Sequence, residues 1–176
     1  MQYFVRKFEN NKWISSVEKD KKGYDIDADP CTSCLRTSGN TLSVWKIDCD
    51  IKNKKELEQK LLEISLAMVT SANKIDQIQF IYFPVDDLKN YNYRKNPGNT
   101  PIARLSDLHE ELINLTIKDI VELAELYIKY IKMEYIEIIP KDDIKKKVED
   151  AINNNELNKN NSSKITNKEI RKMLGI

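Results

Sequence analysis

The segments TLSVWKID, at residues 41–48, and IDQIQFIYF, at residues 75–83, decide the fold class. Both are rich in β-branched and aromatic residues, and the first carries apolar side chains on both faces, as strands inside a sheet do. The residues between them repeat apolar side chains at helical spacing, which predicts an amphipathic helix at about 54–72. This order predicts a βαβ unit whose two strands pair in parallel.

The flanking segments extend this prediction on both sides. Residues 2–8 and 13–17 are predicted to form an N-terminal β-hairpin around a polar turn. A helical block follows the βαβ unit, with predicted helices at 106–115 and 117–133. The fold class predicted from these elements is α+β, with a small α/β arrangement as the alternative.

The C-terminal part of the chain differs in composition. Residues 153–165 are rich in asparagine, lysine and serine, which predicts a flexible linker. A capping-box pattern then predicts a short helix within 166–176. We therefore expect one α+β domain at 1–152, a linker, and a terminal helix. That helix could dock on its own core, on a sister subunit or on another protein.

Composition restricts the class of protein. The chain has 176 residues, and its 29 basic and 28 acidic residues give a formal net charge of +1. This balance disfavours strongly basic nucleic-acid binders and acidic DNA mimics, because both rely on a field of one sign. The sequence shows neither a membrane-spanning apolar run nor a signal peptide, and three cysteines indicate a reducing compartment. We expect a cytoplasmic protein without a membrane segment.

Residue usage also suggests an origin. Lysine outnumbers arginine 24 to 5, and isoleucine and asparagine occur 22 and 17 times. The codons of lysine, isoleucine and asparagine are AT-rich, so we expect a low-GC bacterium or its phage.

The segment 84–105 contains the site that we favour. Twenty residues without a predicted element are unusual inside a compact domain, and such loops are often functional, the alternative being a flexible insertion. Tyrosine and arginine dominate the energetically important residues of protein interfaces. The residues predicted to bind a partner are Tyr91, Tyr93, Arg94 and Lys95. The same side chains could stack on and clamp a single-stranded nucleic acid.

An aspartate set provides a second candidate site. Two carboxylates and a lysine near a strand end resemble the metal-binding end of a magnesium-dependent nuclease. The alternative is a solvated strand end that binds nothing. The residues concerned are Asp25, Asp27, Asp48, Asp50 and Lys52.

The cysteines provide a third candidate. Cys31 and Cys34 form a CxxC pair, and a structural zinc would need two further ligands, for which Cys49 and His109 are the available soft donors. Incidental, half-buried thiols are the simpler interpretation. His109 is also the only side chain whose unperturbed pKa suits general acid–base catalysis near neutral pH.

These observations favour a non-enzymatic protein-binding or regulatory subunit of a bacterial or phage system, with no cofactor. A role in toxin immunity or anti-phage defence fits the size and composition. The partner would be another protein, or a second copy bound through the helix at 117–133, which is apolar on most sides. The alternatives are a metal-dependent nuclease or hydrolase that uses the aspartate set, and a nucleotide- or nucleic-acid-binding module. Nucleic acid is the less favoured partner.

Overall fold

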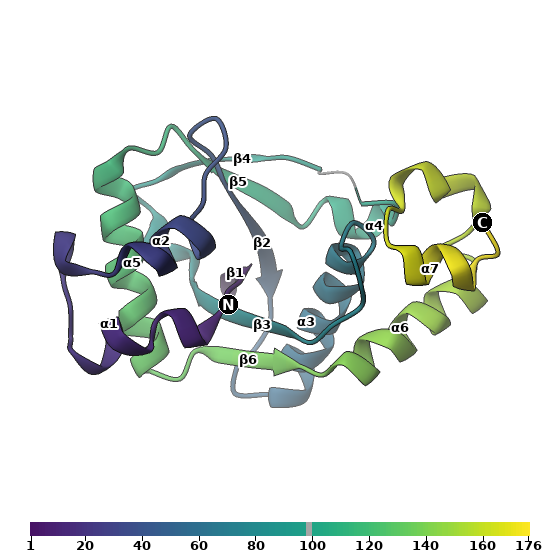
Figure 1. The fold of residues 1–176 in the computed structure, drawn as a ribbon, viewed down its shortest axis with the longest axis horizontal. Coiled ribbons are helices and arrows are strands. Elements are labelled where there is room, and N and C mark those ends of the chain that lie inside the picture. Colours follow the sequence, from purple (N-terminus) through teal and green to yellow (C-terminus); the bar gives the residue numbers. More distant parts are fainter. Residues whose placement is uncertain (98–99) are drawn as a thin grey trace.

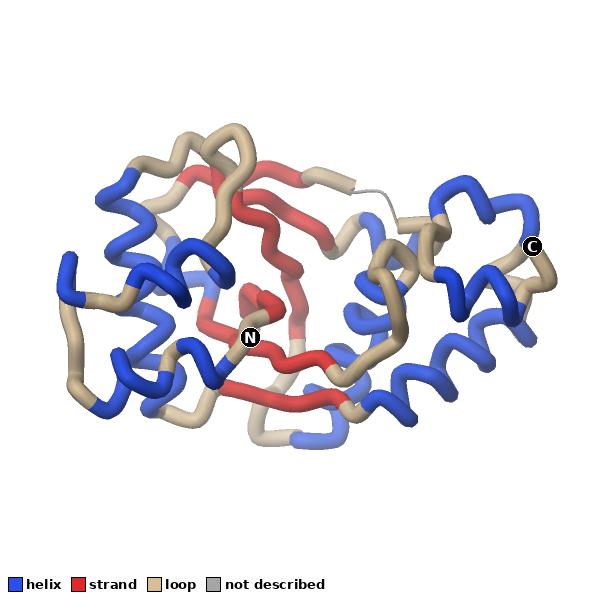
Figure 2. The backbone as a smooth tube through the Cα atoms, viewed as in Figure 1, coloured by secondary structure: helices blue, strands red, loops and turns tan. Residues whose placement is uncertain are grey.

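The computed structural model describes residues 1–97 and 100–176, and within them six strands form one antiparallel sheet between two groups of helices (Figures 1 and 2). The predicted α+β class is confirmed. The sheet order is β4-β5-β2-β1-β3-β6. The strands are β1 (Gln2–Lys7), β2 (Leu42–Asp48), β3 (Ile78–Pro84), β4 (Asn92–Lys95), β5 (His109–Ile113) and β6 (Ile136–Ile139).

Helices cover both faces of the sheet and divide the core into two clusters. On one face lie α1 (Ile14–Glu18), α2 (Ala28–Cys34) and α5 (Ile117–Lys132). On the other lie α3 (Lys54–Val69), α4 (Ala103–Ser106), α6 (Lys141–Asn153) and α7 (Lys168–Met173). The connecting 3-10 helices are η1 (Asn10–Lys12), η2 (Gly23–Asp25), η3 (Val85–Leu88) and η4 (Lys159–Lys164). No helix in the described residues has the length and apolar character that crossing a membrane requires.

Strand β1 occupies the middle of the sheet, and this corrects the predicted βαβ unit. Both β2 and β3 pair antiparallel with β1, so they run in the same direction but do not pair with each other. Tyr3, Phe4 and Val5 are all buried, with Phe4 facing one cluster and its two neighbours facing the other. A strand that is apolar on both faces is most stable between two others, so β1 inserts between the strands predicted to pair.

The predicted N-terminal hairpin is wrong. Its second strand, residues 13–17, forms α1 instead, and β1 pairs with more distant strands. Trp13, at the start of α1, is fully buried and stacks on Tyr127 of α5 with ring centroids 5.1 Å apart. Trp13 and Val17 lie on the packed face at a spacing of four, but five residues are too few for that periodicity to be recognised in the sequence.

The structure also changes the assignment between residues 84 and 115. The segment 84–105 contains η3, β4 and α4, and residues 98–99 of the predicted loop lie outside the described residues. The helix predicted at 106–115 is instead β5, in which Glu110 and Leu112 are buried. A charged residue at an inward position hides the alternation that would have indicated a strand.

Helix α5 explains why residues 117–133 are apolar on most sides. One side packs on β3, and another contacts α1 and η2. The large apolar residues that it leaves strongly exposed, Ile117 and Met133, lie at its two ends. Association of two copies through this helix stays a prediction.

Residues 153–176 fold back against the core. In the segment predicted to be a linker, η4 forms and Leu157 and Ile165 are buried, as is Ile170 of α7. Asn167 makes the decisive contacts: its side-chain oxygen accepts the amides of Glu169 (2.9 Å) and Ile170 (3.3 Å), and its side-chain nitrogen donates to the carbonyl of Val69 (2.9 Å). One buried amide thus caps the start of α7 and the end of α3. The division into domain, linker and terminal helix stays a prediction.

We predict that Asn167→Ala lowers the free energy of unfolding by about 2–3 kcal/mol, because it removes an N-cap and leaves buried backbone groups unpaired. Urea unfolding followed by tryptophan fluorescence measures this change. The control is Asn160→Ala, at an exposed position, which should change the value by less than about 0.5 kcal/mol. Equal effects of the two substitutions would contradict the role of Asn167.

Candidate functional site: the outer edge of the sheet

Three of the four residues predicted to bind a partner, Tyr93, Arg94 and Lys95, lie in β4, an edge strand of the sheet whose residues Asn92–Lys95 are all exposed. Tyr91 comes just before the strand and is half-buried. The Asn96 amide donates to the His109 carbonyl at 3.1 Å, so Asn96 belongs to a hydrogen-bonded pair of the antiparallel ladder. Because such pairs alternate along a strand, the backbone groups of Arg94 point towards β5, whereas the N–H and C=O groups of Tyr93 and Lys95 point outwards. The strand therefore offers two residues with hydrogen-bonding groups directed away from the sheet.

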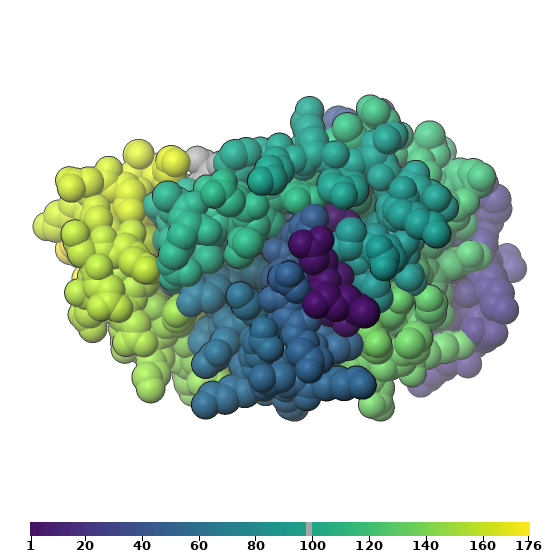
Figure 3. Space-filling model, turned by 180° about the vertical axis from the view of Figure 1, so that it is seen from behind, coloured from purple at the N-terminus to yellow at the C-terminus, as the bar shows by residue number. Residues whose placement is uncertain are grey.

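Tyr93 rests against the core at one side of this edge. Tyr93 as a whole residue is 44% exposed. Its ring meets the ring of the fully buried Phe4 edge to face, with centroids 5.6 Å apart. Two strands, β2 and β5, lie between β4 and β1. In a flat sheet the backbones of Tyr93 and Phe4 would therefore be about 14 Å apart. The sheet therefore curls and brings Tyr93 over the N-terminal end of β1. Figure 3 shows this end of the chain (purple) on the surface, bordered by the teal stretch that includes β4 and β5.

The segment that leads into β4 is fixed to α5. Asp87 of η3 accepts hydrogen bonds from the Lys129 ammonium at 2.9 Å and the Tyr130 hydroxyl at 2.7 Å. These contacts hold the pKa of Asp87 below its ordinary value, Lys129 having the largest effect. The half-buried ring of Tyr91 places its hydroxyl 3.5 Å from a Glu122 carboxylate oxygen, and burial raises its pKa. The entry to the edge strand is thus ordered before any partner binds.

The charges at the edge are unevenly compensated. Arg94 donates from two nitrogens to one carboxylate oxygen of Glu111, at 3.0 and 3.2 Å. Glu110 is 4% exposed, and its nearest cation is the Lys46 ammonium at 4.0 Å. Within the described residues, no carboxylate lies at ion-pair distance from the Lys95 ammonium. Lys95 stands opposite Glu110 in the strand register without forming a direct ion pair, so the edge carries an ammonium group that a partner can reach beside an exposed aromatic ring.

The structure does not bring the predicted aspartate set together. Asp27 bonds the Ser16 hydroxyl at 2.8 Å and pairs with Lys21, beside α1 and α2. Asp48 pairs with the Met1 ammonium at 3.0 Å, and the Asp50 carboxylate accepts the Lys52 amide at 3.0 Å, both just past the buried part of β2. Asp25 lies in η2. In residues 1–97 and 100–176 no group of three or more potential ligands could hold a metal ion.

The predicted zinc set is likewise divided. Cys34 belongs to the core cluster around α5 and Cys31 packs against it, whereas Cys49 belongs to the cluster on the opposite face of the sheet. All three are free thiols, and burial raises the pKa of Cys31 and Cys49. His109 begins β5, where its Nδ1 lies 2.5 Å from the Asn96 carbonyl oxygen. This contact places a ring proton on Nδ1, which donates to the carbonyl oxygen.

The chain was compared with models of protein families, with curated proteins and with solved structures, and no match was found.

Sequence reasoning named the exposed side chains of the edge but missed their support. Phe4 and Lys46 underlie Tyr93, the Lys46 ammonium being 5.7 Å from its ring centroid. Both come from strands far away in the sequence, so no local pattern links them to Tyr93. The spacing of Tyr91 and Tyr93, followed by two prolines, was the available signal for a short strand here.

We predict that Asp87→Asn lowers the free energy of unfolding at neutral pH by about 0.5–1 kcal/mol, because it removes the charge that Lys129 and Tyr130 bind at a partly exposed site. A carboxyl whose pKa is lowered by folding stabilises the protein above its unfolded pKa and loses this effect as pH falls through the folded pKa. The difference between wild type and variant should therefore shrink as the pH falls below about 4, the ordinary pKa of an aspartate, and disappear once the carboxyl is protonated in the folded protein. Urea titrations at several pH values test this. Asp86→Asn, at the neighbouring exposed position, should show no such convergence.

Proposed function

We propose that the protein is a non-enzymatic binding subunit that takes up an extended segment of another protein along β4. The observation that supports this most is the pair of outward-directed backbone positions, Tyr93 and Lys95, on an exposed edge strand. Adding a strand to such an edge is a common mode of peptide recognition, in which main-chain hydrogen bonds give affinity and alternate side chains give specificity. The anchors at Asp87 and Tyr91 favour this mode, because an ordered edge loses little entropy on binding.

The partner segment that fits this edge is extended and carries an apolar and an acidic residue two positions apart, because Tyr93 and Lys95 lie on the same face of β4. The apolar side chain would cover the exposed part of Tyr93, and the acidic one would meet the Lys95 ammonium. A second copy of β4 fits less well, because Arg94 and Lys95 would then face like charges across the new pair of strands. The proposed partner is therefore a different protein.

The cellular setting proposed here comes from composition. The three free cysteines agree with a reducing cytosol. The abundance of lysine, isoleucine and asparagine agrees with a bacterial or phage origin. A place in a toxin-immunity or anti-phage system stays a proposal based on size and composition alone. The nuclease alternative has less support, since the aspartate set is divided between separate parts of the fold.

The test is to select peptides from a random display library on the whole protein and to measure their affinity for two variants at one position. Lys95→Pro removes the outward N–H and leaves the ladder to β5 intact, whereas Lys95→Ala removes only the charged side chain. We expect enriched peptides to carry an apolar and an acidic residue two positions apart. Lys95→Pro should weaken their binding by more than about tenfold, and Lys95→Ala by about threefold.

Amide hydrogen exchange gives an independent readout that needs no variant. The amides of Tyr93 and Lys95 should exchange quickly in the free protein and slowly with a selected peptide bound. The proposal fails if no peptide is enriched, if the proline variant binds as well as the alanine variant, or if these two amides stay unprotected.

A further inference from the structure

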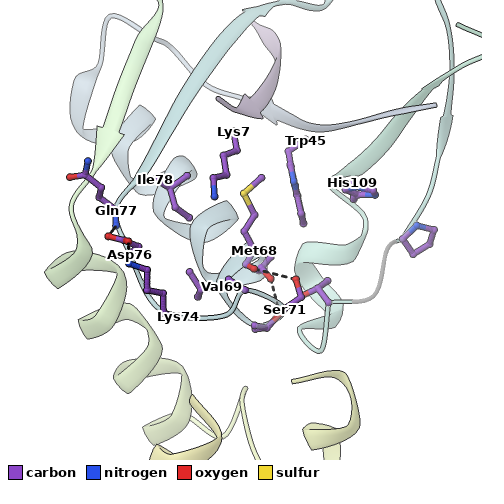
Figure 4. Close-up of a pocket in the computed structure, with 15 residues that line it drawn as sticks. Lys7, Trp45, Met68, Val69, Ser71, Lys74, Asp76, Gln77, Ile78 and His109 are labelled. Carbon is purple, nitrogen blue, oxygen red and sulfur yellow. Dashed lines mark hydrogen bonds and ion pairs between the residues drawn. The ribbon is translucent and has the colours of Figure 1, made fainter. Parts of the chain in front are cut away.

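A cavity of about 370 Å³ opens on the face of the sheet opposite α5, at the C-terminal end of β1 (Figure 4). Trp45 of β2, Ile78 of β3 and Lys7 of β1 line it on the side of the sheet, and Met68 and the last turn of α3 line it from the other side. The volume is within the range of small-molecule sites, about 300–1,000 Å³. It is separate from the outer edge of β4.

Lys7 is the central residue of this region. It also lines two adjoining cavities. One, of about 230 Å³, reaches between β1 and β2 to Cys34 of α2, and the other, of about 540 Å³, reaches the turn after α3. In Figure 4 the Lys7 side chain projects from β1 towards Met68, into the hollow between Ile78 and Trp45. The side chain of an exposed lysine usually extends into open solvent. The Lys7 side chain instead places its ammonium over a concave surface.

The acidic residues nearby do not compensate Lys7. Asp76 at the rim pairs with Lys74 at 2.6 Å, and Glu9 pairs with Lys12 at 3.0 Å. Among the described residues, no carboxylate lies within ion-pair distance of the Lys7 ammonium. The hollow therefore has an unpaired positive charge, which attracts an anion.

The rest of the cavity suits a flat apolar group. Trp45 is 8% exposed, and His109 packs against its indole with centroids 5.0 Å apart and planes 71° to each other. Met68 and Ile78 add a thioether and a branched aliphatic side chain. Aromatic rings pack well against tryptophan and methionine. His109 is held by the Asn96 carbonyl through Nδ1, whereas the Lys7 ammonium has no carboxylate partner among the described residues, so the anion belongs at Lys7.

We propose that this cavity binds a small aromatic carboxylate, with the ring against Trp45 and Met68 and the carboxylate on the Lys7 ammonium. The site lies against α3 and involves no residue of β4 itself, although Pro97 and Thr100 from the segment that follows β4 also line it. It adds a small-molecule ligand to the proposed protein partner.

The test compares 2-naphthylacetate with 2-naphthylacetamide, which has the same ring and shape without the charge. Calorimetry with the whole protein should show that the acid binds about tenfold more tightly than the amide. Backbone amide NMR shifts caused by the acid should map to Lys7, Trp45 and the end of α3. In Lys7→Gln the preference for the acid should disappear while the affinity for the amide stays within about twofold.

The matched control is Lys89→Gln, an exposed lysine outside this hollow, which should keep the preference for the acid. The proposal is overturned if the acid and the amide bind alike to the wild type, if neither binds at about 5 mM, or if the preference survives in Lys7→Gln. It is also overturned if the NMR shifts lie elsewhere. If the Gln variant does not fold, Lys7→Met serves instead and should likewise lose the preference for the acid.

Discussion

The burial of β1 on both faces is the constraint on which the rest of the structure depends. Tyr3, Phe4 and Val5 need apolar partners above and below the sheet and hydrogen-bonding neighbours on both sides. The neighbours are β2 and β3, which are thereby kept apart although only one helix joins them in the sequence. The two helical layers follow, since each side of β1 requires its own cover.

The same arrangement determines which surfaces remain open. Because β1, β2 and β3 fill the centre and β5 pairs with β2, strands β4 and β6 become the edges. Strand β4 acquires a rigid base from the curl of the sheet and from the Asp87 and Tyr91 contacts to α5. The hollow around Lys7 lies where β1 ends, so both candidate sites lie at margins of one central strand.

The sequence predicted β1, β2, α3, β3 and α5 well, because each has a long apolar pattern of one period. It failed where a short segment is decided by distant contacts. Residues 13–17 become helical because Trp13 stacks on Tyr127, and β5 forms although Glu110 points inwards. Of the candidate sites, the exposed residues of β4 were visible in the sequence. The Lys7 hollow was not, since its walls come from five separate elements, β1, β2, α3, β3 and β5.

Asn167 has a wider significance than its two caps. The backbone amides of Thr166 and Asn167 bind the carbonyl of Thr70, and the Glu169 carboxylate accepts the Ile75 amide, so the tail secures the turn that forms one wall of the Lys7 hollow. If the tail opened, this wall would lose these hydrogen bonds, so a ligand bound in the hollow and the closed tail would stabilise each other. A ligand in the hollow would shield the chain beyond residue 165 from proteases, and the rate of C-terminal cleavage would report its occupancy.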